Sequence, residues 1–327
     1  MRSADEVVVS LTQLGADAVD GAPVGSGIQP TRARLVLRRF LRSRKAVCGL
    51  AAIVLLFLLA YLGPWLTPWG YAEIDNSAYL QSPSAEHWFG TTQIGLDVFA
   101  QTMRGLQKSL VIGLLVGVIS TGLASIVGAA AGYFGGWTDR VLMWMVDLLL
   151  VLPGSLIIAI LSPTFRGRTW LVFVLVLAGF AWMISARIVR GLTLSLRERE
   201  FVLAARFMGV PPWKIIFRHI LPNMSSLLII DATITVGAAI LGETALSYLG
   251  FGVQPPDVSL GTLIASGQDS VFTFPWLFLF AAGFLIVAVL SANLVGDGLR
   301  DALDSSSARP RPDTRDPDVK DPGRADQ

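Results

Sequence analysis

The side chains best able to do chemistry in this sequence are a few charged residues set in apolar stretches. Asp231 and Glu243 stand twelve positions apart in the apolar segment 227–251, which places them about 120° apart around an ideal helix. A carboxylate inside a membrane is costly, so such acids usually face protein or water. Two roles stay open for each of them: lining a polar pathway, or packing through hydrogen bonds against neighbouring helices.

No group of residues has the spacing of a catalytic, metal or nucleotide site. One cysteine, Cys48, excludes an internal disulfide, and two histidines, His87 and His219, are too few for a histidine-rich metal site. The sequence contains no G-x-x-x-x-G-K-[ST] motif and no Gly-Lys pair, so it has no P-loop of the usual form. Motifs of the type G-x-S-x-G and H-E-x-x-H are also missing. We therefore expect no catalytic residue, no metal and no cofactor in this chain, and any energy must come from a partner.

The composition is that of a protein that crosses a membrane several times. Hydrophobic residues make up 53% of the 327 positions, charged residues only 15%, and the mean hydropathy is +0.60. About 20 apolar residues cross the hydrocarbon core of a bilayer. Six segments qualify, at 46–66, 109–134, 141–161, 170–188, 227–251 and 274–295. The sequence predicts an all-α integral membrane protein with six transmembrane helices.

Basic residues give these spans an orientation. An even number of spans places both chain ends on one side, and cytoplasmic flanks attract Lys and Arg. With the ends inside, four of the 26 Lys and Arg residues lie outside: Arg104, Lys108, Arg166 and Arg168. We expect cytoplasmic termini, external loops at 67–108 and 252–273, and a cytoplasmic loop at 197–223 within the core 109–302.

The two ends of the chain differ in composition from the core. Residues 1–30 and 303–327 have no sustained hydrophobic period, which indicates disordered cytoplasmic tails. Segment 31–45, "TRARLVLRRFLRSRK", separates its apolar residues from arginines at fourfold spacing. The apolar face holds Val36, Leu37, Phe40 and Leu41. This pattern predicts a basic amphipathic helix on the inner leaflet, a positive anchor for the first span, or both.

Two further patterns lie inside the predicted spans. Small residues recur along the second span, at Gly113, Gly117, Thr121, Ala124, Gly128 and Gly132. They allow close helix crossing, either within the chain or against a partner. Asp147 follows Arg140 by seven positions on the same helix face, which favours a charge pair within or between helices near the inner leaflet.

A polar hairpin interrupts the apolar half of the chain between Glu200 and Asn223, "EFVLAARFMGVPPWKIIFRHILPN". Two apolar stripes have helical spacing: Phe201, Ala204, Ala205 and Met208, then Trp213, Ile216, Phe217 and Ile220. Gly209 suits a helix C-cap, and Pro211-Pro212 can stop one helix and open the next. The pattern predicts a rigid helix–turn–helix. It either transmits force to the spans from a cytoplasmic partner or only packs beneath them.

This hairpin resembles the cytoplasmic loop of ABC importer permeases. Residues 203–222, "LAARFMGVPPWKIIFRHILP", are similar to the pattern E-A-A-x-x-x-G-x9-I-x-L-P. The matching positions are Ala204, Ala205, Gly209, Leu221 and Pro222. Leu203 and His219 depart from the pattern, and with the start "E-F-V-x-A-A-R", which includes Phe201 and Arg206, they resemble the dipeptide/oligopeptide/nickel branch.

Three more stretches resemble the same branch and follow its order, so that the resemblance covers roughly residues 32–302. They are "HWFGTTQIGLDVFAQTMRG" (87–105), "GYFGGWTDRVLMWMVDLLLVLPG" (132–154) and "LGETALSYLGFGVQPPDVSLGTLI" (241–264). Four positions in them depart from the branch pattern: Thr92, Leu96, Val258 and Leu260. These departures concern the outer face of the protein.

The resemblance implies a type I ABC importer permease fold and a place in a larger machine. The long first external loop and the basic lead resemble the second, C-type permease of such systems. The implied partners are a homologous permease, two ATP-binding subunits that hold ATP and Mg, an external solute-binding protein and the lipid bilayer, with no nucleic acid. The implied location is the bacterial plasma (inner) membrane, and the implied cargo is di- or oligopeptides.

The resemblance also assigns roles to the residues named above. It places Phe201, Ala204, Ala205, Arg206, Gly209, Leu221 and Pro222 in the loop that couples the permease to the ATPase. Glu243 matches its motif, which favours a structural role at the interface between two permeases, whereas Asp231 stays open between pathway and packing. Nickel or glutathione import is the alternative within the family, and a stand-alone secondary transporter or channel is the alternative outside it.

Overall fold

The computed structural model describes residues 32–165 and 170–303 of the chain. The tail predicted at 1–30 lies outside these residues, as does the C-terminal tail beyond Leu303. All packing reported below lies within the unit that begins at Val36.

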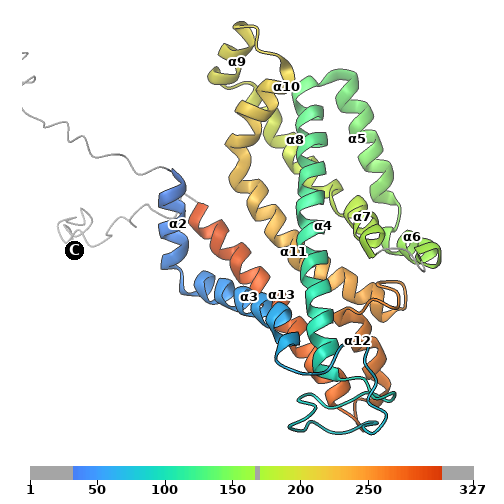
Figure 1. The fold of residues 1–327 in the computed structure, drawn as a ribbon. Helices are drawn as coiled ribbons and strands as arrows, with labels where there is room; N and C mark the ends of the chain where they lie inside the picture. The colour runs from blue at the N-terminus through green and yellow to red at the C-terminus, as the bar shows by residue number, and fades with distance from the viewer. Residues whose placement is uncertain (1–31, 166–169, 304–327) are drawn as a thin grey trace, which may run out of the picture. The chain divides into compact units, whose positions relative to one another are not determined.

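The described part of the chain is built almost entirely from helices (Figure 1). Four helices are long and apolar enough to cross a membrane: α3 (Arg44–Leu62), α4 (Val98–Phe134), α11 (Ser225–Tyr248) and α13 (Trp276–Leu303). Two bent pairs reach the same hydropathy: α5 (Gly136–Val151) with α6 (Gly154–Leu161), and α7 (Trp170–Ala181) with α8 (Met183–Arg197). The shorter helices are α2 (Arg32–Arg42), α9 (Glu200–Phe207), α10 (Pro212–Ile215) and α12 (Leu260–Gly267). With each bent pair as one span, the predicted all-α fold with six spans is confirmed.

The two bends differ from the straight spans that hydropathy predicts. The chain turns by 72° between α5 and α6, where Leu152 is extended and Pro153 follows it. Proline has no N–H for the helical ladder and disfavours a helical residue before it, so the bend has a local cause. The 46° bend between α7 and α8 has no proline. There, the Trp182 indole N–H donates to the Gly179 carbonyl oxygen at 2.9 Å, which satisfies a group freed at the break.

Helix α4 is the element against which α3, α5, α7, α8, α11 and α13 all pack. Its glycines explain how closely two of these helices approach. A Cβ atom on Gly113 would lie 2.6 Å from Ile240 Cγ1 of α11, and one on Gly132 would lie 2.7 Å from Thr193 Cβ of α8. Real Cβ atoms do not approach other atoms that closely. The small residues of the second predicted span therefore serve packing within this chain.

The apolar face predicted for the first amphipathic helix is divided between two environments. Phe40 of α2 is buried in a cluster with Ala46 and Ala302, and Val36 packs against the same cluster. Leu37 and Leu41 are exposed in the chain by itself. One part of the apolar face thus anchors α2 to α3 and α13, and the other part is free for lipid.

Part of the predicted external loop 67–108 is helical, because α4 begins at Val98. Asp97 is its N-cap, and its Oδ1 accepts a hydrogen bond from the Ala100 N–H at 2.7 Å. The residues before it form irregular turns pinned by two isolated β-bridges, Ile74 with Leu96 and Thr91 with Asp97. Figure 1 shows this loop at the end of α4 opposite to α9 and α10.

Candidate functional site

The predicted helix–turn–helix is present, with the turn where the sequence places it. Gly209 follows α9 with φ at +74°, a conformation that only glycine adopts without strain. Its N–H donates to the Arg206 carbonyl oxygen at 3.0 Å, and the Val210 N–H donates to the Ala205 carbonyl oxygen at 3.1 Å. These bonds close the last turn of α9. Pro212 then opens α10 at its first position.

One face of this hairpin is anchored to the membrane helices. Ala205 is buried in a cluster with Ala129 of α4 and Val189 of α8. The other hairpin members of the cluster are Val202, Ile215, Ile216 and Ile220, with Leu221 partly buried against them. Burial of apolar side chains at both ends of the hairpin fixes it to the bundle.

The opposite face, which we call the hairpin surface, leaves large apolar side chains uncovered. Its residues are Phe201, Ala204, Phe207, Met208, Trp213 and Phe217. Phe207 is 89% and Met208 75% exposed. The predicted stripes therefore divide, with Ala205, Ile216 and Ile220 facing inward and the remaining stripe residues facing outward. Large exposed apolar patches of this kind mark interaction sites.

The second half of the hairpin contains turns that spacing did not predict. Ile216–Ile220 form a π-helical turn and Leu221–Met224 a 3₁₀ turn, which lead into α11. Pro222 in the second turn has no N–H and cannot continue an α-helical ladder, so the helix changes its winding around it. Pro222 itself is exposed.

Asp231 lies on α11 between α4 and α8. Its carboxylate accepts hydrogen bonds from Thr121 Oγ1 at 2.8 Å and from Ser185 Oγ at 2.6 Å. It also borders a cavity of about 240 Å³ that Ile188 and Arg300 help to line. Asp231 thus has two fixed hydroxyl partners and an open side, on a cavity that is otherwise lined mostly by aliphatic side chains.

Glu243 lies inside the chain, which corrects the expectation that it lines a pathway or meets a second permease. It is fully buried. Ser247 Oγ donates to its Oε1 at 2.6 Å, and Ser109 Oγ donates to its Oε2 at 3.2 Å. The same hydroxyl oxygens accept from the N–H groups of Val253 at 3.2 Å and Leu260 at 3.2 Å. Through these hydrogen bonds, Glu243 joins α11 and α4 to the loop before α12. Its side chain has no accessible surface in this chain, so it cannot touch another subunit.

Helices α5 and α8 are joined by two ion pairs. Arg190 donates two hydrogen bonds to Asp139, at 2.5 and 2.6 Å. Arg187 pairs with Asp147. The charge partner of Asp147 is thus on a neighbouring helix. Of the two alternatives that the sequence left open, a pair within the helix and a pair between helices, the structure has the second.

His87 organises the part of the predicted external loop that precedes α4. Its ring is buried and stacks on Trp69, with ring centroids 4.7 Å apart. Nδ1 lies 2.8 Å from Asp97 Oδ2, and Nε2 lies 3.4 Å from Asp75 Oδ2. The hydroxyl and N–H of Ser77 donate to Asp75 and hold its pKa below the usual value of 3.8. Within residues 32–165 and 170–303, no three His, Cys, Asp or Glu side chains are placed to hold a metal ion.

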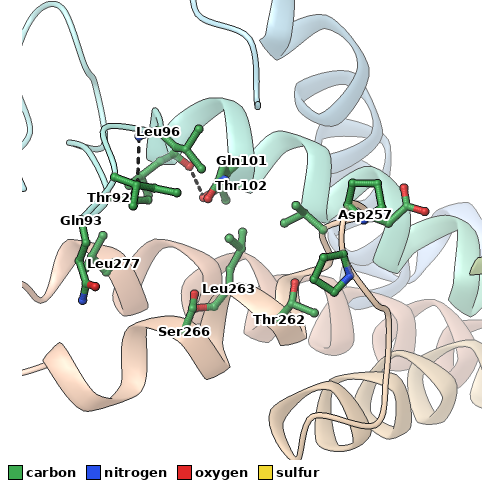
Figure 2. A pocket seen from close by; sticks show the side chains of 15 residues that line it. Thr92, Gln93, Leu96, Gln101, Thr102, Asp257, Thr262, Leu263, Ser266 and Leu277 are labelled. Carbon is green, nitrogen blue, oxygen red and sulfur yellow. Dashed lines mark hydrogen bonds between the residues drawn. The ribbon is translucent and has the colours of Figure 1, made fainter. Parts of the chain in front are cut away.

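A cavity of about 420 Å³ opens between the external loop, the start of α4 and the segment before α12 (Figure 2). Three of the four positions that depart from the branch pattern line it: Thr92, Leu96 and Val258. The fourth, Leu260, is fully buried. Asp257 at its rim pairs with Lys108 Nζ at 2.8 Å, and that ammonium lies 4.4 Å from the Trp170 ring centroid. Three of the four departures thus line one cavity.

Comparison with known proteins gives matches along most of the chain. The family model described as "Binding-protein-dependent transport system inner membrane component" matches residues 124–309. A second model, "N-terminal TM domain of oligopeptide transport permease C", matches residues 31–83.

Curated relatives cover most of both chains. "Oligopeptide transport system permease protein OppC" of Mycobacterium tuberculosis (strain ATCC 25618 / H37Rv) is 59% identical over 278 residues, 85% of this chain and 96% of the relative. The protein of the same name from Bacillus subtilis (strain 168) is 36% identical over 267 residues, 81% of this chain and 87% of the relative. Among solved structures, an inward-facing form of the MetNI methionine ABC transporter aligns with 62% of this chain and 97% of that chain, at 19% identity and a TM-score of 0.49.

Proposed function

Because this chain belongs to the family of binding-protein-dependent transport system inner membrane components, we propose that it is the second permease of an importer of di- and oligopeptides. The observation that carries the proposal is 59% identity along 85% of the chain to a relative whose name states oligopeptide transport. The match of residues 31–83 to the N-terminal region of permease C supports the C-type assignment.

The chain works as one part of a complex. A second, homologous permease completes the pathway, two ATP-binding subunits inside the cell bind ATP and Mg, and an external binding protein delivers the peptide. The sequence has no P-loop, so ATP hydrolysis belongs to the partners.

The hairpin surface is the docking site for an ATP-binding subunit. Its exposed aromatic and methionine side chains offer apolar contact area, while Ala204 and the turn at Gly209 let another surface approach closely. The buried face of the same hairpin is fixed to α4 and α8. Movement of the docked subunit is thereby passed to the membrane helices.

Asp231 belongs to the translocation pathway, and Glu243 holds the chain together. Asp231 borders an open cavity and keeps its carboxylate ordered through two hydroxyl groups. Glu243 fastens the external loop before α12 to two spans and meets no solute.

Both termini lie in the cytoplasm, and the loop at 67–108 lies outside. In a Cys48→Ser background, a cysteine at exposed Ser77 reacts with an impermeant thiol reagent on intact cells, and a cysteine at exposed Arg206 does not. The reverse labelling would overturn this orientation.

Solute uptake tests the proposed function directly. The chain is deleted from cells that carry the complete importer, and uptake of labelled trialanine, nickel and glutathione is measured. We expect loss of trialanine uptake alone, with recovery when the wild-type chain is restored. Loss of nickel or glutathione uptake with unchanged trialanine uptake would instead support the alternative solutes of this family.

A further inference from the structure

An ion pair between two membrane-spanning helices is open on the surface of the chain. Arg187 of α8 bonds Asp147 of α5 through one guanidinium nitrogen. The Arg187 side chain is 51% exposed and the Asp147 side chain 59% exposed. The neighbouring pair of Arg190 with Asp139 is more covered and makes two hydrogen bonds. The covered pair is built to join the helices, whereas the open pair keeps free donors and acceptors.

Both charged residues lie far from the ends of their broken spans. Asp147 follows the start of α5 by eleven residues, and Arg187 precedes the end of α8 by ten. At 1.5 Å per helical residue, each lies roughly 15 Å along its helix from that end. In a bilayer whose hydrocarbon core, about 30 Å thick, begins at those two helix ends, both charges lie within the core.

The helix faces that carry the pair are not packed in the chain by itself. Trp144, Leu148 and Val151 share the exposed stripe of Asp147 on α5. Ile184, Ile188 and Leu192 share the exposed stripe of Arg187 on α8. The buried side of α8 faces α4 instead, through Ala186 and Val189. The open pair therefore points away from the core of this chain.

Lipid cannot cover such a face, because exposed charges at this depth are too costly in hydrocarbon. A dry contact with an apolar helix would leave the free guanidinium donors without partners, at a cost for each buried group. Water satisfies them without such a cost. The same stripe also borders a cavity, because Ile188, next to Arg187 in sequence, lines the cavity of Asp231.

We propose that the Asp147–Arg187 pair lines the water-filled translocation pathway and contacts the charged ends of the peptide in transit. The inference rests on the proposed peptide import for the nature of the solute. A free peptide carries an ammonium group and a carboxylate. A carboxylate accepts hydrogen bonds from an ammonium group, and a guanidinium group matches the geometry of a carboxylate. An open pair of opposite charges therefore complements both ends of a zwitterion.

Thiol accessibility tests the position of the pair in the assembled complex. In a Cys48→Ser background, Ile184→Cys places a thiol on the exposed stripe of α8 and leaves the ion pair intact. Leu175→Cys on the exposed face of α7 is the matched apolar control. A charged, impermeant methanethiosulfonate reagent should modify position 184 about tenfold faster than position 175, since it cannot react in hydrocarbon. Equal rates, or a disulfide to a cysteine on the partner permease, would overturn the pathway position.

Charge exchange tests contact with the solute. The double variant D147R/R187D keeps a bridge between α5 and α8 but reverses the charges, while D147N/R187Q removes both. We expect both variants to assemble and to lower trialanine uptake by about threefold, the scale of a water-exposed charged contact. Wild-type uptake in the exchanged variant would show that the pair only bridges helices. Lack of trialanine uptake by the wild-type complex would refute peptide import itself, while the thiol rates would still decide the pathway position.

Discussion

Removal of the Glu243 carboxylate should destabilise this chain without changing which solute is transported. In Glu243→Ala, the hydroxyl groups of Ser109 and Ser247 both lose the acceptor for their protons. Each buried group left unsatisfied costs about 1–3 kcal/mol, so the pair costs about 2–6 kcal/mol. Ser247 Oγ has a second neighbour in Ser259 Oγ at 3.5 Å. Relaxation toward it reduces the expected cost to about 2–4 kcal/mol.

Thermal unfolding of the purified complex measures this loss. At about 2–4 °C for each kcal/mol, the unfolding midpoint should fall by about 4–16 °C. Glu243→Gln keeps one acceptor oxygen and should lose roughly half as much. Thr233→Ala is the matched control, because that hydroxyl lies on the same helix and bonds only to the carbonyl oxygen of Ile229. A midpoint for Glu243→Ala no lower than that of Thr233→Ala would refute the role assigned to the network.

Three other predictions concern the hairpin, the cavity and the external loop. Gly209→Ala should weaken peptide-stimulated ATP hydrolysis, because a left-handed residue with a side chain costs about 1–2 kcal/mol. Gly209→Pro also loses the N–H that bonds to Arg206. It should abolish peptide-stimulated ATP hydrolysis and leave membrane insertion intact. Asp231→Asn should change the trialanine uptake rate but not co-purification of the partner permease; unchanged uptake would exclude a pathway role. The pKa of Asp75 is lowered below 3.8 by its bonds to Ser77. The stability that the ionised Asp75 gives to the folded loop is therefore present above pH 3.8 and is lost as the pH falls through the lower pKa of the folded state. Proteolysis of the external loop should therefore increase at about pH 3 relative to pH 5, and Asp75→Asn should remove that dependence.

The spans and the hairpin were predictable because their signals are local. Hydropathy over about 20 residues locates a membrane helix, and the order of Gly209, Pro211 and Pro212 specifies a turn between two helices. The bend at Pro153 also has a signal in the sequence, although hydropathy passes over it. The bend at Trp182 has none, since it depends on where α7 and α8 pack against α4.

Contacts between distant segments could not be read from spacing. The partner of Glu243 on α4 is Ser109, and the partner of Asp147 is Arg187, each on a different helix. Sequence periodicity shows which residues share a face of one helix, but it does not show which helix packs there. For the same reason, the hairpin stripes were identified but their division into an anchored face and the hairpin surface was not. His87 had no periodic pattern that would connect it to Asp75 and Asp97.

The most direct test of the central claim is to truncate the hairpin surface and to measure ATP-dependent uptake of trialanine by the complete complex in proteoliposomes. Phe207→Ala with Met208→Ala removes two exposed side chains and leaves the buried anchors in place. Phe272→Ala is the matched control, because that side chain is 99% exposed in the segment 268–275, between α12 and α13. We expect the hairpin variant to lose most uptake while the Phe272→Ala complex retains the wild-type rate. Wild-type uptake by the hairpin variant would contradict the account of this chain as a permease driven through that surface.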